Sequence, residues 1–217
     1  MLHILDKQNT LLNRFIAELR DVNIQGDSMR FRRNLERIGE ITAYEISKTL
    51  DYTVQTVETP LGEAVVALPE EDIVVATILR AGIPYHQGFL NYFDRARNAF
   101  VSSYRKYGKD NTFHIKVEYV STCDLTDKIL ILVDPMLATG ASFAYAHQAL
   151  VEKGGKPRHT HLATVIASEE GIEYTKKNFP AAATTIWCGA VDQELTVKSY
   201  IVPGIGDSGD LAYGTKI

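Results

Sequence analysis

The stretch ILILVDPMLATGAS, residues 129–142, constrains the fold of this chain more than any other feature. Its apolar run, 129–133, is typical of a strand buried on both faces of a sheet. The run ends in Asp134, and a turn of small residues leads into a helical pattern at 142–153. Because ligands of open α/β sheets bind where such strands end, the stretch predicts an α/β fold with a ligand site after this strand.

Further strands and helices alternate along the chain. Apolar, β-branched runs predict strands at residues 73–79, 161–167 and 184–188. Apolar periodicity predicts helices at residues 9–20, 28–50 and 169–178. This alternation favours a mainly parallel sheet flanked by helices on both faces. We expect one domain over residues 1–217, with N-terminal helices in residues 1–50.

Two regions fall outside the alternation. Residues 100–126 are rich in Tyr, Lys and Thr, and we predict an extended hairpin or flap there. Residues 201–215, IVPGIGDSGDLAYGT, combine Gly, Pro and Asp with apolar residues such as Ile205 and Leu211. Those apolar anchors favour a structured loop over a frayed tail.

Composition narrows the class of protein. The chain has 217 residues, 45% of them hydrophobic and 23% charged, which is ordinary for a globular domain. A net charge of −4 disfavours nucleic acid and acidic membranes as partners. We find no apolar run that would span a bilayer and no export signal, so we expect a cytoplasmic protein. Cys123 and Cys188 fit no metal or redox spacing and should be reduced thiols, while His159 and His161 are expected to be exposed.

The turn after residue 133 suits a sugar phosphate. Small side chains let a ligand approach the backbone, and the first amides of a helix lack internal partners and attract anions. Thr139 and Ser142 add hydroxyl donors, and Asp134 can accept hydrogen bonds from two neighbouring hydroxyls. A capped helix without a ligand remains the alternative. The Gly-Lys-Ser/Thr of a Walker loop and the Gly-x-Gly-x-x-Gly of a dinucleotide site are both absent.

At this point a family resemblance becomes specific. ILILVDPMLATGAS resembles the phosphoribosyl pyrophosphate (PRPP) motif of type I phosphoribosyltransferases, and its Asp-Pro-Met-Leu-Ala-Thr-Gly form is similar to that of the uracil phosphoribosyltransferase family. That family shares Pro135 but usually has glycine where this chain has Ala141. Alanine is tolerated there if the backbone has a negative φ, as at a helix start.

Two arginines extend the resemblance. ILRAGIP, residues 78–84, is similar to the family's pyrophosphate-gripping loop and supplies Arg80, a cation with several parallel donors. The resemblance also implies a strained peptide bond in this loop. SSYRK resembles a Tyr-Arg pair that brings Arg105 to the same pyrophosphate, although the flap that follows departs from the family. Without the resemblance, a surface ion pair and a solvated flap residue would be the simpler interpretations of the two arginines.

The C-terminal segment YIVPGIGDSGDLAYGTK, residues 200–216, resembles the family's uracil-recognition loop. Its glycines expose backbone donors and acceptors that could complement the edge of a planar base. The resemblance implies that Ile201, Gly206 and Ser208 line the base, and that Asp207 faces the donor and its metal. The family usually has alanine at position 208. A weaker likeness, FRRNLERIGEITAYE at 31–45, matches the family's N-terminal helix.

The resemblance as a whole implies conversion of uracil and PRPP to UMP and diphosphate, with Mg²⁺ held mainly by the PRPP itself, near Asp207. The implied catalytic residues are Asp134, Arg80 and Arg105. The implied PRPP-binding residues are Arg80, Arg105, Asp134, Pro135, Met136, Leu137, Ala138, Thr139, Gly140, Ala141, Ser142 and Asp207, and the uracil-binding residues are Ile201, Gly206, Asp207 and Ser208. A homo-oligomer, a dimer or larger, is also implied. Transfer to another base, or a non-enzymatic regulator that senses PRPP, are the alternatives.

Overall fold

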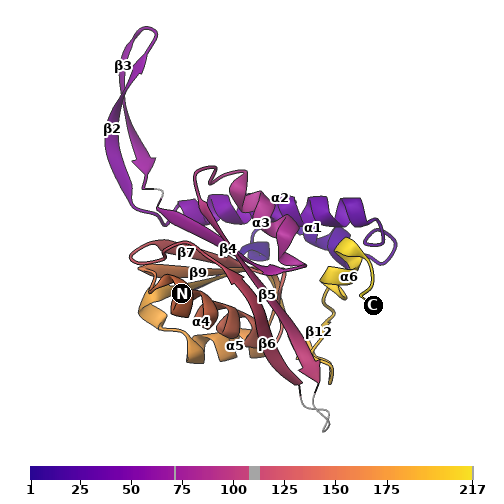
Figure 1. The fold of residues 1–217 in the computed structure, drawn as a ribbon. Helices are drawn as coiled ribbons and strands as arrows, with labels where there is room; N and C mark the ends of the chain where they lie inside the picture. The colour runs from indigo at the N-terminus through magenta and orange to yellow at the C-terminus, as the bar shows by residue number, and fades with distance from the viewer. Residues whose placement is uncertain (71, 108–112, 217) are drawn as a thin grey trace.

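A mainly parallel sheet forms the centre of the molecule (Figure 1). The computed structural model describes residues 1–70, 72–107 and 113–216, and within them all side chains except those of residues 103–117. In these residues the strand order is β1-β10-β9-β7-β4-β5-β6, parallel except for the antiparallel pair of β5 and β6, and β8 adds to β9. The strands are β1 (Leu2–Ile4), β4 (Ile73–Leu79), β5 (Arg97–Tyr107), β6 (Phe113–Ser121), β7 (Ile129–Val133), β8 (Met136–Leu137), β9 (His159–Ser168) and β10 (Thr184–Asp192).

Helices cover both faces of this sheet. The helices are α1 (Leu11–Arg20), α2 (Ser28–Ser47), α3 (Gly82–Leu90), α4 (Ala141–Gly154), α5 (Glu169–Asn178) and α6 (Ser208–Tyr213). Short elements complete the fold: η1 (Leu5–Lys7), η2 (Ala181–Ala183), β11 (Glu194–Leu195) and β12 (Ile201–Val202). One buried cluster joins α1, α2 and α3 to the sheet, and a second joins α4 and α5 to it. The predicted α/β class with helices on both faces is therefore confirmed.

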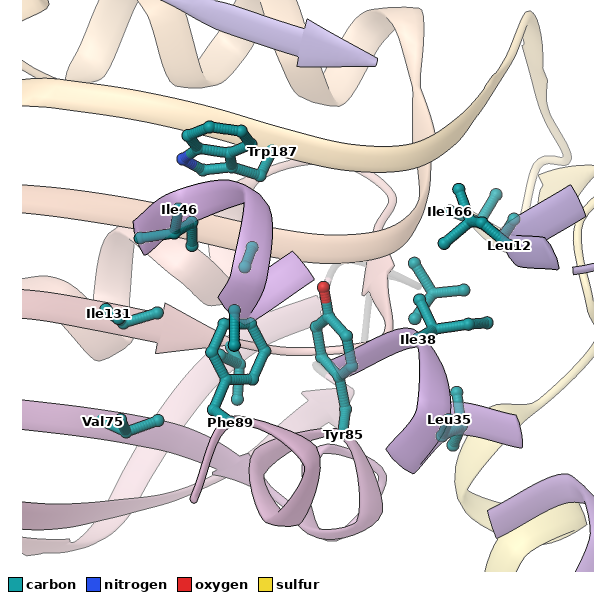
Figure 2. Close-up of a cluster of buried hydrophobic side chains, with 14 of the residues drawn as sticks. Leu12, Leu35, Ile38, Ile46, Val75, Tyr85, Phe89, Ile131, Ile166 and Trp187 are labelled. Carbon is teal, nitrogen blue, oxygen red and sulfur yellow. The ribbon is translucent and has the colours of Figure 1, made fainter. Parts of the chain in front are cut away.

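Local sequence explains where the helices begin. The side chain of Asp27 accepts hydrogen bonds from the first amides of α2, and Ser168 does the same for α5. Phe31, Leu35 and Ile38 of α2 are buried, as their spacing predicts. Figure 2 shows Leu35 and Ile38 in one cluster with Tyr85 and Phe89 of α3 and with sheet residues such as Val75.

Two glycines allow α2 and α3 to pack unusually close together. A Cβ atom on Gly88 would overlap the carbonyl oxygen of Glu36, and one on Gly39 would overlap the carbonyl oxygen of Tyr85. Any side chain at these positions would force the helices apart. This contact fixes α3, which directly follows the loop that carries Arg80.

The sequence did not predict one prominent element, the hairpin of β2 (Tyr52–Thr59) and β3 (Gly62–Pro69). In the described residues these strands pair only with each other, and Figure 1 shows them projecting from the body of the molecule. Most of their side chains are exposed, including those of Val54 and Val65. The extended hairpin predicted within 100–126 is present as the antiparallel pair of β5 and β6, while its role as a flap stays a prediction.

The predicted exposure of the strand histidines is wrong. His161 is only 3% exposed, and the indole N–H of Trp187 donates a 3.1 Å hydrogen bond to its Nδ1. Burial, aided by the nearby His159 and His3, lowers the pKa of His161 to about 3. His159 is half-buried, and its Nε2 lies 3.0 Å from the hydroxyl of Thr185. Both histidines thus have structural partners on the neighbouring strand.

No helix in the described part of the chain is both long enough and apolar enough to cross a membrane. Cys123 and Cys188 are free thiols, and Cys188 is buried in the core. Burial raises the pKa of the Cys188 thiol to about 12, so it stays protonated at neutral pH.

Candidate active site

The strand order places two predicted loops side by side. β4 and β7 are parallel neighbours, with Thr77 opposite Val133. Their carboxyl ends therefore meet at one edge of the sheet, where Arg80 follows β4 and Asp134 follows β7. Residues about fifty positions apart in the sequence are brought together here by sheet topology alone.

A cavity of about 500 Å³ opens at this edge. Predicted residues from three of the resembling segments line it, including Arg80, Asp134 and Asp207. The lining residues are Ile78, Leu79, Arg80, Ala81, Asp134, Met136, Ala138, Thr139, Gly140, Ser142, Phe143, Ser199, Tyr200, Asp207, Ser208, Gly209 and Lys216. A cavity of this size suits a small phosphorylated ligand.

The small-residue turn before α4 has the geometry of an anion site. Gly140 adopts φ 80°, a left-handed conformation that favours glycine, and α4 has no side-chain cap. A Cβ atom on Gly140 would lie 2.6 Å from the ring of Tyr174, so close packing also requires glycine. Ala141 is the first residue of α4, and its helical backbone tolerates alanine as expected. Among the described residues, the only side-chain acceptor for the first amides of α4 is the Thr139 hydroxyl, 3.5 Å from the amide of Ala141, so the helix start can still bind an anion.

Asp134 is a partly buried acid at the cavity wall. Burial raises its pKa to about 7, against the opposing effect of the Met136 amide, which lies 3.5 Å from its Oδ1. Its own backbone N–H donates to the carbonyl of Ala163 on β9. The backbone is thus fixed by the sheet, while the carboxyl group remains available to a ligand.

Arg80 reaches from the end of β4 to the C-terminal segment. The peptide bond between Leu79 and Arg80 is cis, at the position where the resemblance implied an unusual bond. The Nη2 atom of Arg80 lies 3.1 Å from Oδ1 of Asp210 and 3.3 Å from the carbonyl oxygen of Gly214. Its Nε atom is buried and has no hydrogen-bond partner among the described residues. Part of the guanidinium is therefore held by protein, and part is free for a ligand.

The segment after β12 forms α6 at the cavity mouth. Asp207 caps this helix by accepting a 3.0 Å hydrogen bond from the amide of Asp210. Ser208 is 2% exposed, and its hydroxyl has no partner within the described structure. A buried hydroxyl without a partner is costly, so a ligand or water that bonds to it would be favoured.

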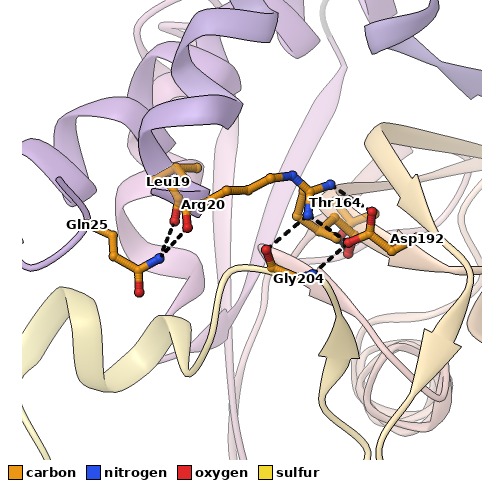
Figure 3. A network of polar contacts seen from close by, with 7 residues as sticks. Leu19, Arg20, Gln25, Thr164, Asp192 and Gly204 are labelled. Atoms are coloured by element: carbon orange, nitrogen blue, oxygen red, sulfur yellow. Dashed lines mark hydrogen bonds and ion pairs between the residues drawn. The ribbon is translucent and has the colours of Figure 1, made fainter. Parts of the chain in front are cut away.

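A buried ion pair holds the start of this segment in place (Figure 3). Arg20 of α1 makes two 2.8 Å contacts with the carboxylate of Asp192, and its Nη1 also donates to the carbonyl of Gly204. The amide of Gly204 in turn donates to Asp192. The chain between β12 and α6 is therefore tied to both α1 and β10.

Some predicted residues lie near the cavity without lining it, namely Pro135, Leu137, Ala141, Ile201 and Gly206. The side chain of Ile201 packs into the core, so only its backbone could meet a base. The side chain of Arg105 lies outside the described part of the structure. The cavity is also lined by Ser199, Tyr200 and Lys216, which the sequence did not single out. Tyr200 and Lys216 belong to the C-terminal segment that resembles the uracil-recognition loop, and this resemblance could have identified them as candidate site residues.

Metal chemistry at this site would depend on few protein ligands. Among the described residues there is no group of three or more His, Cys, Asp or Glu side chains that could hold a metal ion. Asp134 and Asp207 do line the cavity, and carboxylate oxygens suit Mg²⁺. The donors present fit an ion that is bound mainly by its phosphate ligand.

Comparison with known proteins gives the same family. The uracil phosphoribosyltransferase family model matches residues 6–215. A uracil phosphoribosyltransferase from Porphyromonas gingivalis is 55% identical over 213 residues, covering 98% of each chain. One from Pyrococcus furiosus is 38% identical over 205 residues, covering 93% of this chain and 85% of that protein.

Solved structures agree on the fold. The AQ2163 protein from Aquifex aeolicus superposes with a TM-score of 0.87 at 28% identity, and the match covers 100% of both chains. An orotate phosphoribosyltransferase from Mycobacterium tuberculosis, solved with PRPP, has a TM-score of 0.52 at 14% identity and covers 87% of this chain and 95% of its own, which supports the fold alone. Together with the cavity geometry, these matches show that the chain belongs to the uracil phosphoribosyltransferase family.

Proposed function

We propose that this chain transfers the phosphoribosyl group of PRPP to uracil, forming UMP and releasing diphosphate. The observation that carries the proposal is a cavity lined together by Arg80, Asp134, four residues of the turn at 138–142 and Asp207. These groups match the charges and hydroxyls of PRPP, and the family relatives indicate uracil as the acceptor.

The sugar phosphate would occupy the end of the cavity next to α4. The amides at the start of this helix and the hydroxyls of Thr139 and Ser142 would bind the 5′-phosphate. Asp134 would accept hydrogen bonds from the ribose hydroxyls. Met136 and Ala138 also line the cavity, while Pro135, Leu137 and Ala141 would act through the backbone.

The reaction breaks the bond between C1′ and the diphosphate oxygen, and the bonding electrons leave with the diphosphate. A bond forms between C1′ and N1 of uracil, which loses its proton. Positive charge develops at the sugar and negative charge on the leaving group, so catalysis depends mainly on position and electrostatics. Arg80 and Arg105 would stabilise the departing diphosphate.

We propose Mg²⁺ as the cofactor. Asp207 would hold the ion, together with the oxygens of PRPP, since its carboxylate lines the cavity. When bound, Mg²⁺ would neutralise charge on the diphosphate. Asp207 also orients the start of α6 through its bond to Asp210, so it would link the metal to the base-binding segment.

The base would lie against the C-terminal segment. Gly206 adopts φ 77°, which sets the direction of the backbone just before Asp207 and Ser208. The backbone of Ile201 and Gly206 would face the polar edge of uracil, and the free hydroxyl of Ser208 offers one further partner. A base with a different pattern of donors would leave buried polar groups unpaired, which disfavours its binding.

Purified protein tests this proposal directly. With PRPP and Mg²⁺, uracil should be turned over to UMP, while cytosine, hypoxanthine and orotate release little diphosphate. Asp134→Ala should lower turnover by roughly two orders of magnitude or more, with the fold retained. Asp72→Asn, which alters an exposed acid remote from the cavity, is the matched control. Preference for another base would favour the first alternative, a phosphoribosyltransferase of different specificity.

The second alternative is a regulator that senses PRPP. Such a protein would need a surface for nucleic acid, and the net charge of −4 argues against one. Salt-sensitive binding to RNA or DNA without uracil turnover would support it. We propose small-molecule substrates alone, without a nucleic-acid or membrane partner, and a cytoplasmic location, which suits the two free thiols.

We also propose that the chain works as a homo-oligomer. The β2–β3 hairpin exposes Val54, Leu61 and Val65, and an isolated hairpin with both faces in water is marginally stable at best. A second copy of the chain would cover it. Light scattering after gel filtration should show a dimer or larger, and replacing Val54 and Val65 by Lys should yield a smaller species.

A further inference from the structure

The ion pair between Arg80 and Asp210 joins two segments that are 130 positions apart. The Nη2 atom of Arg80 lies 3.1 Å from Oδ1 of Asp210 and 3.3 Å from the carbonyl oxygen of Gly214. Both hydrogens on this nitrogen are therefore directed at the C-terminal segment. Neither the PRPP motif nor the residues implied to bind the base include Asp210.

Asp210 is itself firmly held. Its amide donates to Oδ1 of Asp207 at 3.0 Å, and its carbonyl accepts a 2.8 Å hydrogen bond from the amide of Gly214. It lies on α6 next to Ser208, which is buried. The backbone of Asp210 is thus held in place, and its carboxylate reaches Arg80 from the same short helix that begins at Ser208, one of the residues proposed to bind the base.

The rest of the guanidinium is available to a ligand. The Nε atom of Arg80 is buried without a partner in the described structure, although the residue lines the cavity. A buried N–H without an acceptor is costly, so an anion that bonds to it is favoured. Because Asp210 occupies Nη2, it determines how the remaining N–H groups are directed.

We propose that Asp210 is a positioning residue, which orients the guanidinium of Arg80 toward the diphosphate of PRPP. This inference rests on the proposed function. In this arrangement α6 links the two ends of the site, because the helix that contacts the base also orients the arginine that contacts the diphosphate. An oriented charge-assisted donor loses less freedom when a ligand binds.

The test uses two ligands that differ in the diphosphate. PRPP with Mg²⁺ carries the group that Arg80 would meet, whereas UMP shares the ribose phosphate and the base but lacks the diphosphate. In Asp210→Ala, titration calorimetry should give a Kd for PRPP raised about tenfold. The Kd for UMP should stay within about twofold, because its contacts do not involve Arg80.

Four further variants complete the design. Asp72→Ala removes the acid of another Arg–Asp pair, with Arg97, and should leave both affinities unchanged. In Arg80→Lys, adding Asp210→Ala should cause little further loss for PRPP, since the two residues act together. Rescue of PRPP affinity by Asp210→Glu would support the role of the carboxylate.

Other outcomes overturn the inference. Equal weakening of PRPP and UMP in Asp210→Ala would show that Asp210 merely supports the shape of α6. Unchanged PRPP affinity would show that Arg80 needs no such partner, and additive losses in the double variant would show independent action. Failure of the unaltered protein to bind PRPP or to form UMP would instead refute the proposed function, and the inference with it.

Discussion

The ion pair of Arg20 and Asp192 should be a principal support of the C-terminal segment, and Asp192→Asn tests this. Asp192 is 7% exposed and accepts three hydrogen bonds, two from Arg20 at 2.8 Å and one from the amide of Gly204 at 2.9 Å. Asparagine has the same size but only one oxygen. Its NH₂ group must then face a donor of Arg20 or Gly204, and the charge of Arg20 loses its partner.

The magnitude follows from burial. Breaking a buried ion pair costs about 3–5 kcal/mol, and single hydrogen bonds to charged groups contribute about 1.5–3 kcal/mol. Since the side chain of Arg20 is 25% exposed, water replaces part of the lost interaction. We therefore expect the free energy of unfolding to fall by about 3 kcal/mol, at the lower end of the range. In a chain of this length, that lowers Tm by roughly 6–12 °C.

Thermal unfolding followed by circular dichroism measures this change. Asp72→Asn is the control, because its ion pair with Arg97 is exposed and should contribute at most about 1 kcal/mol. The Michaelis constant for uracil should also rise in Asp192→Asn, since Gly204 loses its anchor. If the two variants melt within about 2 °C of each other, the reasoning about burial is wrong.

Three further outcomes are expected. Burial raises the pKa of Asp134 to about 7 from an ordinary 3.8, so the native protein keeps a proton that the unfolded chain releases. As the pH rises from about 4 to about 7, the free energy of unfolding of the ligand-free protein, measured by urea titration, should fall. In Asp134→Asn it should fall less. Gly88→Ala should lower the unfolding free energy by about 2–3 kcal/mol, because a Cβ atom meets the carbonyl of Glu36. Ser208→Ala should raise it by about 1 kcal/mol in urea denaturation, because it removes a buried hydroxyl without a partner.

Much of the fold could be predicted because several elements carry a strong local signal. The strands at 73–79 and 129–133 and the helix at 169–178 have the predicted bounds. Continuous apolar runs are sufficient to identify strands that are buried on both faces. The hairpin at 52–69 was missed although its second strand holds the apolar run AVVAL at 64–68; this run is exposed or half-buried, and the order of the hairpin depends on pairing between its own strands.

Tertiary partners explain what local patterns missed. His161 was expected at the surface, but the indole of Trp187, on the neighbouring strand, supplies a donor that satisfies a buried imidazole. Similarly, the ion pair of Arg80 with Asp210 joins distant segments, and no spacing in the sequence reveals it. The loops after β4 and β7 were predictable because a motif gave the residues and strand topology gave their common edge. The role of Arg105 stays a prediction.

The cavity is assembled from segments that the ribosome makes at very different times. Arg80 emerges early and the turn at 138–142 later, but Asp207 and Lys216 are translated only after every strand of the main sheet. A nascent chain can therefore build its sheet before it can hold a ligand. The complete cavity exists only after translation has passed α6, so full stabilisation by a ligand begins at that point.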